Sequence, residues 1–474
     1  MNRPIKVLLI IFIICLMAVV ANLSWIQIFG AEGIEENAFN KRRLVEEYAI
    51  QRGDILSADR QVIARSVDTG TEYQYQREYP LGPLFADVTG YDSWRYGRSG
   101  LEKTYNKELL GSGSALTLRS LANKLLGASK KGNSLVLTVD SRLQATATEA
   151  LAGRKGAVVA LDPKTGAVLA MVTAPTYNPN VTVPFQSDGT AAWDALVADP
   201  NQPLVDRCTS GLYPPGSSFK VVVAAAALDS GVVDPETPYN CTGELLVHGF
   251  TIHDFGGKSH GNITFADALV VSCNNTFAQT GLSLGAPSLV QYAELFGFNE
   301  IIPFNLPVAL SRIQEAESMD PVALASSSVG QAEVLATPLE MAMVAAAVAN
   351  GGVVMEPYLV EEIQDYNGKI IEQFGPHKWQ EATDRATAST LTRMMVEVVE
   401  KGTGTAARIP GVEVAGKTGT AEVKGVESHA WFICFAPALD PEVAVAVIIE
   451  NGGEGGKAAA PVAREVLQKA LSLD

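Results

Sequence analysis

The sequence predicts an α/β (α+β) protein whose largest domain is a five-stranded antiparallel sheet with helices on both faces. Strand-like apolar segments occur in two groups, one near residue 160 and one after residue 410, and mainly helical patterns separate them. A long apolar run at the N-terminus adds one membrane segment. The chain has 474 residues, which is enough for two or three folded units.

The composition is that of a globular protein. Hydrophobic residues make up 47% and charged residues 19%, which excludes a disordered chain or a coiled coil. The net charge of −16 repels phosphate backbones, so nucleic acid is not an expected partner. The five cysteines include no CxxC pair, so neither a zinc ribbon nor a disulfide scaffold is expected. A bridge between Cys208 and Cys241 and buried free thiols both stay open.

The N-terminal segment predicts a signal anchor. Residues 7–21 are all apolar, and we assign the membrane helix to residues 7–29. Arg3 and Lys6 precede it and acidic residues follow it, so the positive-inside rule places residues 1–6 in the cytoplasm and the rest outside. A cleaved signal peptide is the alternative, but the run ends without an A-x-A site.

A domain boundary is expected near residue 133. Residues 30–133 mix charged, aromatic and short apolar segments and predict a small first domain. A turn then leads into the alternating residues 135–139, which open a second domain over residues 134–474.

The second domain begins and ends with strands. Residues 157–161 and 167–172 flank a five-residue turn and predict a hairpin. Three strands with short connections follow near the C-terminus and should pair antiparallel: residues 412–422, 431–436 and 443–450. The remaining predicted elements are helices, two of which stop at glycine: residues 217–230, 338–350 and 458–471.

Ser217 and Lys220 form the first chemical motif. Pro214, Pro215 and Gly216 cannot continue a helix backward, so Ser217 falls at a helix N-terminus, where a developing negative charge is favoured. Lys220 lies on the same helix face, and a neutral amine there could take the serine proton for acyl transfer. An isolated SxxK also fits a simple serine cap, so this motif alone is weak.

Two further motifs make the set specific. Ser272-Cys273-Asn274 follows an apolar stretch, and Lys417-Thr418-Gly419-Thr420 lies in the first C-terminal strand. The order SxxK, SxN, KTG is shared by penicillin-binding proteins and serine β-lactamases.

The whole chain resembles the class B penicillin-binding proteins, most closely the actinobacterial PbpA group of peptidoglycan transpeptidases. Other motifs of that class support the resemblance: Arg52-Gly53-Asp54-Ile55, Ser99-Gly100-Leu101-Glu102, Ser328-Val329-Gly330-Gln331, Thr337-Pro338-Leu339, Gly402-Thr403-Gly404 and His429-Ala430-Trp431-Phe432. The resemblance implies the penicillin-binding transpeptidase/serine β-lactamase-like fold over residues 134–474. It also implies a non-catalytic, dimerisation-like pedestal over residues 30–133.

The implied function is that of a membrane-anchored peptidoglycan D,D-transpeptidase. Such an enzyme crosslinks stem peptides through a serine acyl-enzyme and is inhibited covalently by β-lactams. Implied partners are the D-Ala-D-Ala donor, an amine acceptor and a glycan polymerase of the RodA/FtsW type. A catalytically weak β-lactam-binding scaffold and a serine β-lactamase or D,D-carboxypeptidase are the alternatives. Roles in elongation, division and sporulation are not distinguished.

Site roles follow from the resemblance, residue by residue. Ser217 resembles the nucleophile, Lys220 its base, and Ser272 the proton relay to the leaving nitrogen. Asn274 resembles a donor to the substrate peptide. The implied binding group for the terminal carboxylate or the β-lactam comprises Lys417, Thr418, Gly419 and Thr420, and the backbone N–H groups of Ser217 and Thr420 resemble an oxyanion hole.

No cofactor or metal is expected from the sequence. His248, His253 and His260 have spacings that suit a metal only if folding brings them together, and we expect no cysteine or acidic cluster to complete them.

Lys220 poses an electrostatic problem. Lowering a lysine pKa from about 10.4 to about 7 costs roughly 4.6 kcal/mol, more than mild burial supplies. We therefore expect a second cause, the positive charge of Lys417, with the two amines titrating as a coupled pair.

Overall fold

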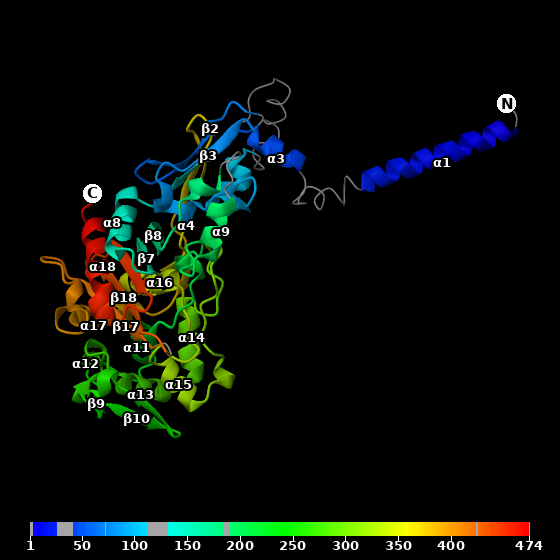
Figure 1. The fold of residues 1–474 in the computed structure, drawn as a ribbon. Helices are drawn as coiled ribbons and strands as arrows, with labels where there is room; N and C mark the ends of the chain where they lie inside the picture. Colours follow the sequence, from blue (N-terminus) through cyan, green and yellow to red (C-terminus); the bar gives the residue numbers. More distant parts are fainter. Residues whose placement is uncertain are drawn as a thin grey trace.

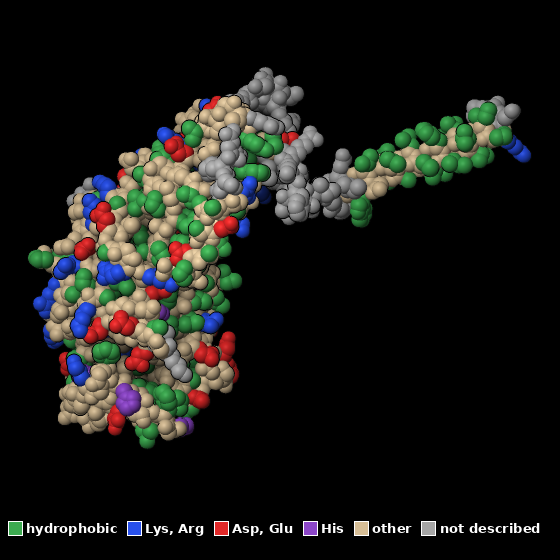
Figure 2. Space-filling model, viewed as in Figure 1, with side chains coloured by type: hydrophobic (Ala, Val, Ile, Leu, Met, Phe, Trp, Pro, Cys, Tyr) green, Lys and Arg blue, Asp and Glu red, His purple; other side chains and the backbone are tan. Residues whose placement is uncertain are grey.

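The computed structural model describes residues 3–25, 41–71, 73–111, 131–183, 190–422 and 425–473. Helix α1 (Arg3–Trp25) is apolar apart from its first turn and a few residues near its end, with a mean hydropathy of 2.9 over its most apolar 18 residues. It is the one helix in the described ranges that is long and apolar enough to cross a membrane. In Figure 2, hydrophobic side chains cover it on the visible face. The predicted span continues to residue 29, and its last four residues lie outside the described ranges.

A six-stranded sheet carries the first globular part, in the order β15-β14-β6-β1-β2-β3. β6 pairs parallel with β1 and antiparallel with β14, so strands from far along the chain complete this sheet. The sheet is thus shared across the predicted boundary at residue 133, and the domain division itself stays a prediction. The strands are β1 (Ile55–Leu56), β2 (Val62–Asp68), β3 (Tyr75–Glu78), β6 (Ser134–Leu137), β14 (Val360–Gln364) and β15 (Ile370–Gln373).

Short elements surround this sheet. They are α3 (Lys41–Tyr48), η2 (Gly82–Phe85), α4 (Ala86–Thr89), β4 (Asp92–Ser93), β5 (Gly97–Arg98), α5 (Gly100–Thr104) and α6 (Asn106–Leu109). The two N-terminal motifs meet here, because Arg52 Nη2 lies 2.8 Å from Glu102 Oε2, and Arg77 Nε lies 2.5 Å from Glu102 Oε1. All three side chains are buried, so removing one partner would leave an uncompensated buried charge.

The second sheet has five antiparallel strands in the order β17-β18-β19-β7-β8, which confirms the predicted fold class. The N-terminal hairpin therefore joins the C-terminal strands through β19 and β7. The strands are β7 (Gly156–Leu161), β8 (Val168–Ala174), β17 (Ala415–Ala421), β18 (His429–Ala436) and β19 (Val443–Ile449).

Helices cover both faces of this sheet, as predicted (Figure 1). Alternate strand residues point to opposite faces, so Val159 and Ile433 belong to the core that includes α16 and α11, whereas Val158 and Phe432 belong to the core that includes α8 and α18. The predicted helix over residues 217–230 opens with a 3₁₀ turn before the α-helix starts at Lys220. These helices are α8 (Ser141–Leu151), η5 (Gly216–Phe219), α11 (Lys220–Asp229), α16 (Pro338–Ala349), α17 (Arg385–Glu400) and α18 (Gly455–Ala470).

A mostly helical region, in green in Figure 1, carries two small hairpin-like sheets next to the SxN motif. Its elements are β9 (Pro238–Cys241), β10 (Glu244–Val247), β11 (Phe250–His253), η6 (Phe255–Gly257), β12 (Gly261–Thr264), α12 (Phe265–Val270), α13 (Asn274–Leu284), α14 (Ala286–Phe296) and α15 (Pro321–Ser327). Connecting elements elsewhere are η4 (Pro179–Thr182), α9 (Thr190–Ala198), α10 (Arg207–Ser210), η7 (Ala316–Ser318), β13 (Val353–Met355), β16 (Lys378–Glu381) and η8 (Thr405–Ala407).

Candidate active site

Ser217 lies on the 3₁₀ turn η5, half-buried, on the wall of a cleft of about 1430 Å³. The turn is held against β17, since a Cβ on Gly216 would come within 2.6 Å of the Thr420 carbonyl oxygen. Gly216 also has a φ of +52°, a backbone conformation that favours glycine. Its N–H donates to the Gly330 carbonyl at 2.9 Å, so two separate chain segments fix the turn.

Lys220 begins α11 and is completely buried. Its Nζ donates to the carbonyl oxygen of Ser272 and to Asn274 Oδ1, both at 2.7 Å, and lies 3.4 Å from Ser272 Oγ. The first and second motifs therefore meet at this amine. Burial lowers the pKa of Lys220 to about 7, against the opposing influence of Cys273, Asp254 and Cys241.

Ser272 occupies the short link between α12 and α13 with a φ of +61°, which is strained for a non-glycine residue. Its hydroxyl accepts a hydrogen bond from Lys417 Nζ at 2.8 Å. Because Lys220 Nζ also lies 3.4 Å from this hydroxyl, Ser272 contacts both lysines and can pass a proton between them and the cleft.

Asn274 starts α13, and both ends of its side-chain amide make hydrogen bonds to other residues of the protein. Its Oδ1 accepts from Lys220, and its Nδ2 donates to the His253 carbonyl at 2.9 Å. One N–H of the amide remains for the substrate role that the resemblance implies. The N-cap of α13 is Cys273, whose Sγ accepts from the Thr276 N–H.

Lys417 lies in β17 with its ammonium group beneath Ser272, fully buried. Burial and the neighbouring charge of Lys220 lower the pKa of Lys417 well below its usual range. Complete burial, which the sequence does not reveal, is the first cause that lowers the pKa of each lysine. Repulsion between the two amines further lowers the pKa of Lys417, so burial and not the charge of Lys417 is the main reason for the low pKa of Lys220.

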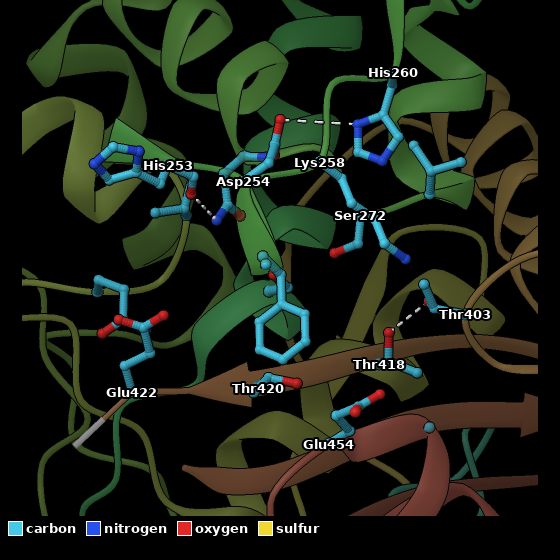
Figure 3. Close-up of a pocket in the computed structure, with 18 of the residues that line it drawn as sticks. His253, Asp254, Lys258, His260, Ser272, Thr403, Thr418, Thr420, Glu422 and Glu454 are labelled. Carbon is cyan, nitrogen blue, oxygen red and sulfur yellow. Dashed lines mark hydrogen bonds and ion pairs between the residues drawn. The ribbon is translucent and has the colours of Figure 1, made fainter. Parts of the chain in front are cut away.

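The threonines of the KTG segment face the cleft. Thr418 and Thr420 both line it, and Thr418 Oγ1 lies 2.6 Å from Thr403 Oγ1, as Figure 3 shows. Thr403 comes from the Gly402-Thr403-Gly404 segment, which supported the family resemblance but gave no site role to Thr403. The structure places Thr403 on the cleft wall.

Gly419 lets β17 lie directly against the serine turn. A Cβ at this position would come within 2.7 Å of Trp431 Cβ and 2.8 Å of the Pro215 carbonyl oxygen. Trp431 Nε1 in turn donates to the Pro214 carbonyl at 2.9 Å, so the strand and the turn form one packed unit.

The substitution Gly419→Ala should push strand β17 and the serine turn apart. We expect a loss of about 1–3 kcal/mol of stability from overpacking, together with slower acylation because Ser217 and Thr420 move apart. Thermal unfolding and the rate of labelling by a fluorescent penicillin measure the two effects. Gly375→Ala is the matched control, because a Cβ there meets nothing within 4 Å. Equal unfolding temperatures and labelling rates for the two variants would contradict the expected role of Gly419.

The structure decides between the two alternatives left open for the cysteines and corrects one expectation about metals. Cys208 and Cys241 are not bridged: Cys208 Sγ lies 3.2 Å from the Val172 carbonyl oxygen, whereas Cys241 Sγ lies 3.0 Å from Cys273 Sγ. The expectation that no cysteine or acidic cluster completes a histidine is wrong. Cys241, Asp254, His260 and Cys273 lie together because β9, β11, β12 and α13 converge behind the SxN motif.

Comparison with known proteins identifies the family. Residues 156–468 match the model of the penicillin binding protein transpeptidase domain, and residues 52–135 match that of the penicillin binding protein A dimerisation domain. The chain belongs to the penicillin-binding transpeptidases. The sequence-based resemblance is thereby confirmed.

Individual relatives of this transpeptidase agree with that assignment. The chain is 37% identical to the peptidoglycan D,D-transpeptidase PbpA of Mycolicibacterium smegmatis, over 99% of both chains. It is 32% identical to the peptidoglycan D,D-transpeptidase MrdA of Acinetobacter baumannii, over 82% of this chain and 65% of MrdA. The ceftriaxone acyl-enzyme structure of penicillin-binding protein A from Mycobacterium tuberculosis has a TM-score of 0.86 and 37% identity, covering 90% of this chain and all of that one.

Proposed function

We propose that this transpeptidase crosslinks peptidoglycan stem peptides by D,D-transpeptidation, with Ser217 as the nucleophile. The observation that carries the proposal is the buried Lys220 amine, three residues along the chain from the cleft serine and hydrogen-bonded to Ser272 and Asn274. An amine whose pKa is about 7 is neutral in a large fraction of molecules at neutral pH, and a neutral amine accepts a proton.

In the first half-reaction, Lys220 takes the hydroxyl proton as Ser217 Oγ attacks the carbonyl of the penultimate D-Ala. The oxyanion is held by the backbone N–H groups of Ser217 and Thr420, at the start of the serine turn and the edge of β17. The peptide bond breaks, and Ser272 delivers its hydroxyl proton to the leaving nitrogen. Ser272 regains a proton from Lys220, whose Nζ lies 3.4 Å from Ser272 Oγ, so both return to their starting forms as the terminal D-Ala departs. An acyl-enzyme remains.

In the second half-reaction, an acceptor amine attacks the ester carbonyl. Lys220 or Ser272 takes a proton from the amine, and the proton returns to Ser217 Oγ as the ester breaks, so the protein is regenerated. The hydroxyls of Thr418 and Thr420 line the wall of the cleft and suit the terminal carboxylate of the donor. Lys417 supports this group from the buried side, where its Nζ donates to Ser272 Oγ, and it adds positive charge when it is protonated. A β-lactam would be held in the same way and leave the serine acylated.

Incubation of the purified full chain with nascent, uncrosslinked glycan strands tests the function directly. We expect crosslinked muropeptides and free D-Ala in equal amounts. D-Ala without crosslinks would indicate a carboxypeptidase instead, and penicillin labelling without either product would indicate a scaffold. Rapid hydrolysis of many penicillin molecules per protein chain would indicate a β-lactamase.

We also propose that α1 anchors the chain as a single-pass span with the catalytic part outside the cell. The apolar length of α1 and the basic residues Arg3 and Lys6 at its start support this orientation. The two-domain division at residue 133 and a RodA/FtsW-type polymerase as partner complete the proposal, because a lone transpeptidase needs glycan strands delivered to it.

Replacing residues 1–31 with an unrelated membrane span tests the role of the anchor in that partnership. The side chains of α1 are exposed and free to pack against a neighbouring span in the wild type. Because the replacement removes them, we expect several-fold less polymerase to co-purify. A variant with the order of residues 7–25 reversed keeps the hydropathy, leaves Arg3 and Lys6 at the start of the span, and serves as the control for tethering. Unchanged co-purification with both replacements would remove α1 from the interface.

A further inference from the structure

The hydroxyl groups of Thr403 and Thr418 form a pair on the wall of the cleft (Figure 3). Their Oγ1 atoms lie 2.6 Å apart, which is a short hydrogen bond between side chains 15 residues apart in the chain. Thr418 is only 6% exposed, whereas Thr403 is exposed. In the part of the chain that the structure describes, Thr418 Oγ1 has no other hydrogen-bond partner. The direction of the Thr418 hydroxyl is therefore set by Thr403.

The backbone around Thr403 is held by three helices. The Thr403 N–H donates to the carbonyl of Val270 at the end of α12, at 3.3 Å. The Gly402 N–H donates to the carbonyl of Val398 in the last turns of α17, at 3.1 Å. A Cβ on Gly456, in the first turn of α18, would overlap the Thr403 carbonyl oxygen. Contacts with α12, α17 and α18 thus fix the place from which the Thr403 hydroxyl reaches β17.

Thr418 is fixed from the opposite side, within the sheet. Its backbone pairs with Phe432 of β18, and its carbonyl accepts from Lys417 Nζ at 2.9 Å. Alternate residues of a strand point to the same side, and Thr418 and Thr420 both line the cleft. Both partners of the hydroxyl pair therefore lie on rigid parts of the structure, next to a second cleft hydroxyl.

The protons of these hydroxyls can be counted. A hydroxyl carries one proton and two lone pairs, so the hydrogen bond between Thr403 and Thr418 uses one of their two protons, whichever oxygen donates. The pair keeps one O–H for the cleft, and Thr420 supplies a second. Two O–H donors match the two oxygens of a carboxylate. An O–H whose oxygen also accepts a hydrogen bond is polarised and donates more strongly.

Positive charge contributes less at this place than oriented hydroxyls do. Lys417 is fully buried, and burial together with the charge of Lys220 lowers its pKa well below the usual range. Lys401 and Lys457 line the cleft, but both are exposed, and the ammonium group of each lies 2.6 Å from a neighbouring glutamate. Surface ion pairs of this kind are weak and screened by salt. A carboxylate in the cleft thus depends on the hydroxyl donors of β17.

We propose that Thr403 is a positioning residue for substrate recognition: its hydroxyl orients that of Thr418, and the pair donates one O–H to the carboxylate of the peptide donor or of a β-lactam. This inference rests on the proposed function, because it concerns the carboxylate of the same donor. It adds a residue outside the three motifs to the group that distinguishes substrates with a carboxylate from substrates without one.

Acylation by a penicillin and by its methyl ester tests this role, because the ester keeps the reactive ring but lacks the carboxylate. The second-order acylation rate is measured on the detergent-purified full chain. Thr403→Val keeps the shape of the side chain and removes its hydroxyl. We expect acylation by the free acid to slow by about 10-fold and acylation by the ester to change by less than about 2-fold.

Two matched variants accompany Thr403→Val. Thr403→Ser keeps the hydroxyl and should restore the wild-type preference for the acid. Thr405→Val changes an exposed threonine of the same segment whose hydroxyl is not bonded to Thr418, and it should keep wild-type rates with both compounds. Thermal unfolding shows whether each variant is folded, and Thr403→Ala replaces Thr403→Val if valine disturbs the segment.

A double variant tests the shared proton. Because Thr403 acts through Thr418, the variant Thr403→Val/Thr418→Val should be acylated by the acid within about 2-fold of Thr418→Val alone. Additive losses would overturn the pairing.

Equal slowing with acid and ester in Thr403→Val would show that the hydrogen bond serves only the fold of the cleft, and unchanged rates with both would remove Thr403 from recognition. Either result leaves the wild type active. Failure of the proposed function would instead appear in the wild type itself, as absent acylation or absent crosslinks, so the two failures are distinguishable.

Discussion

Ser217→Ala is expected to abolish covalent labelling by penicillin, with a loss of at least about 10³-fold in acylation rate, while the protein stays folded. The variant removes the only oxygen proposed to form the acyl bond. The cost in stability should be below about 1 kcal/mol, because the Ser217 side chain does not cap the serine turn. Intact-protein mass after incubation with penicillin measures labelling, and thermal unfolding measures the fold.

Ser218→Ala provides the matched control for the neighbouring hydroxyl. Ser218 is buried, and its Oγ donates to the Pro215 carbonyl at 2.6 Å. Its removal should cost about 1 kcal/mol but leave one penicillin per chain. Labelling of Ser217→Ala at full stoichiometry, or its loss in Ser218→Ala alone, would place the nucleophile elsewhere.

Lys220→Met should have the second-largest effect, lowering the acylation rate by about 10²–10⁴-fold. Methionine fills a similar volume but cannot accept the proton. In the wild type, acylation should rise with pH as Lys220 loses its proton, with a midpoint near the pKa of about 7. The pH–rate profile of Lys220→Met should lose this step, whereas Lys164→Met, on an exposed turn, should keep it.

The pH dependence of the stability of wild type and Lys220→Met provides a second measurement. Burial lowers the pKa of Lys220 from 10.5 to about 7, so between these two pH values the unfolded chain binds more protons than the folded one. The free energy of unfolding of the wild type should therefore rise with pH in this window, by up to about 1.4 kcal/mol per pH unit. Lys417 contributes in the same direction, and because the charge of Lys220 lowers the pKa of Lys417, the difference between wild type and Lys220→Met reports Lys220 together with its effect on Lys417. A pH-independent difference would show that Lys220 is not held neutral by burial.

The sequence by itself determined the features that depend on local order. The apolar run of α1, the strands β17, β18 and β19, and the glycine stop after α16 follow from hydropathy, periodicity and special backbone residues. The three motifs could be recognised in the same way, because each is a short run of neighbouring residues. Their spacing and order were enough to predict the family and its fold.

Only the tertiary structure decided how distant segments meet. β14 joins β6 in the shared sheet although more than half the chain separates the N-terminal strands from it, and no local pattern encodes such a partner. The complete burial of Lys220 is likewise the sum of contacts from separate elements, which is why its pKa could not be derived from neighbouring residues alone.

The cysteine–histidine cluster gives the sharpest example. Cys241, Asp254, His260 and Cys273 have no regular spacing in the sequence, and the histidines alone did not predict a site. Their donor atoms come together because two small sheets fold back onto the start of α13. The arrangement of these four donor atoms depends on long-range strand pairings, whereas the chemistry of each motif depends on residues adjacent in the chain.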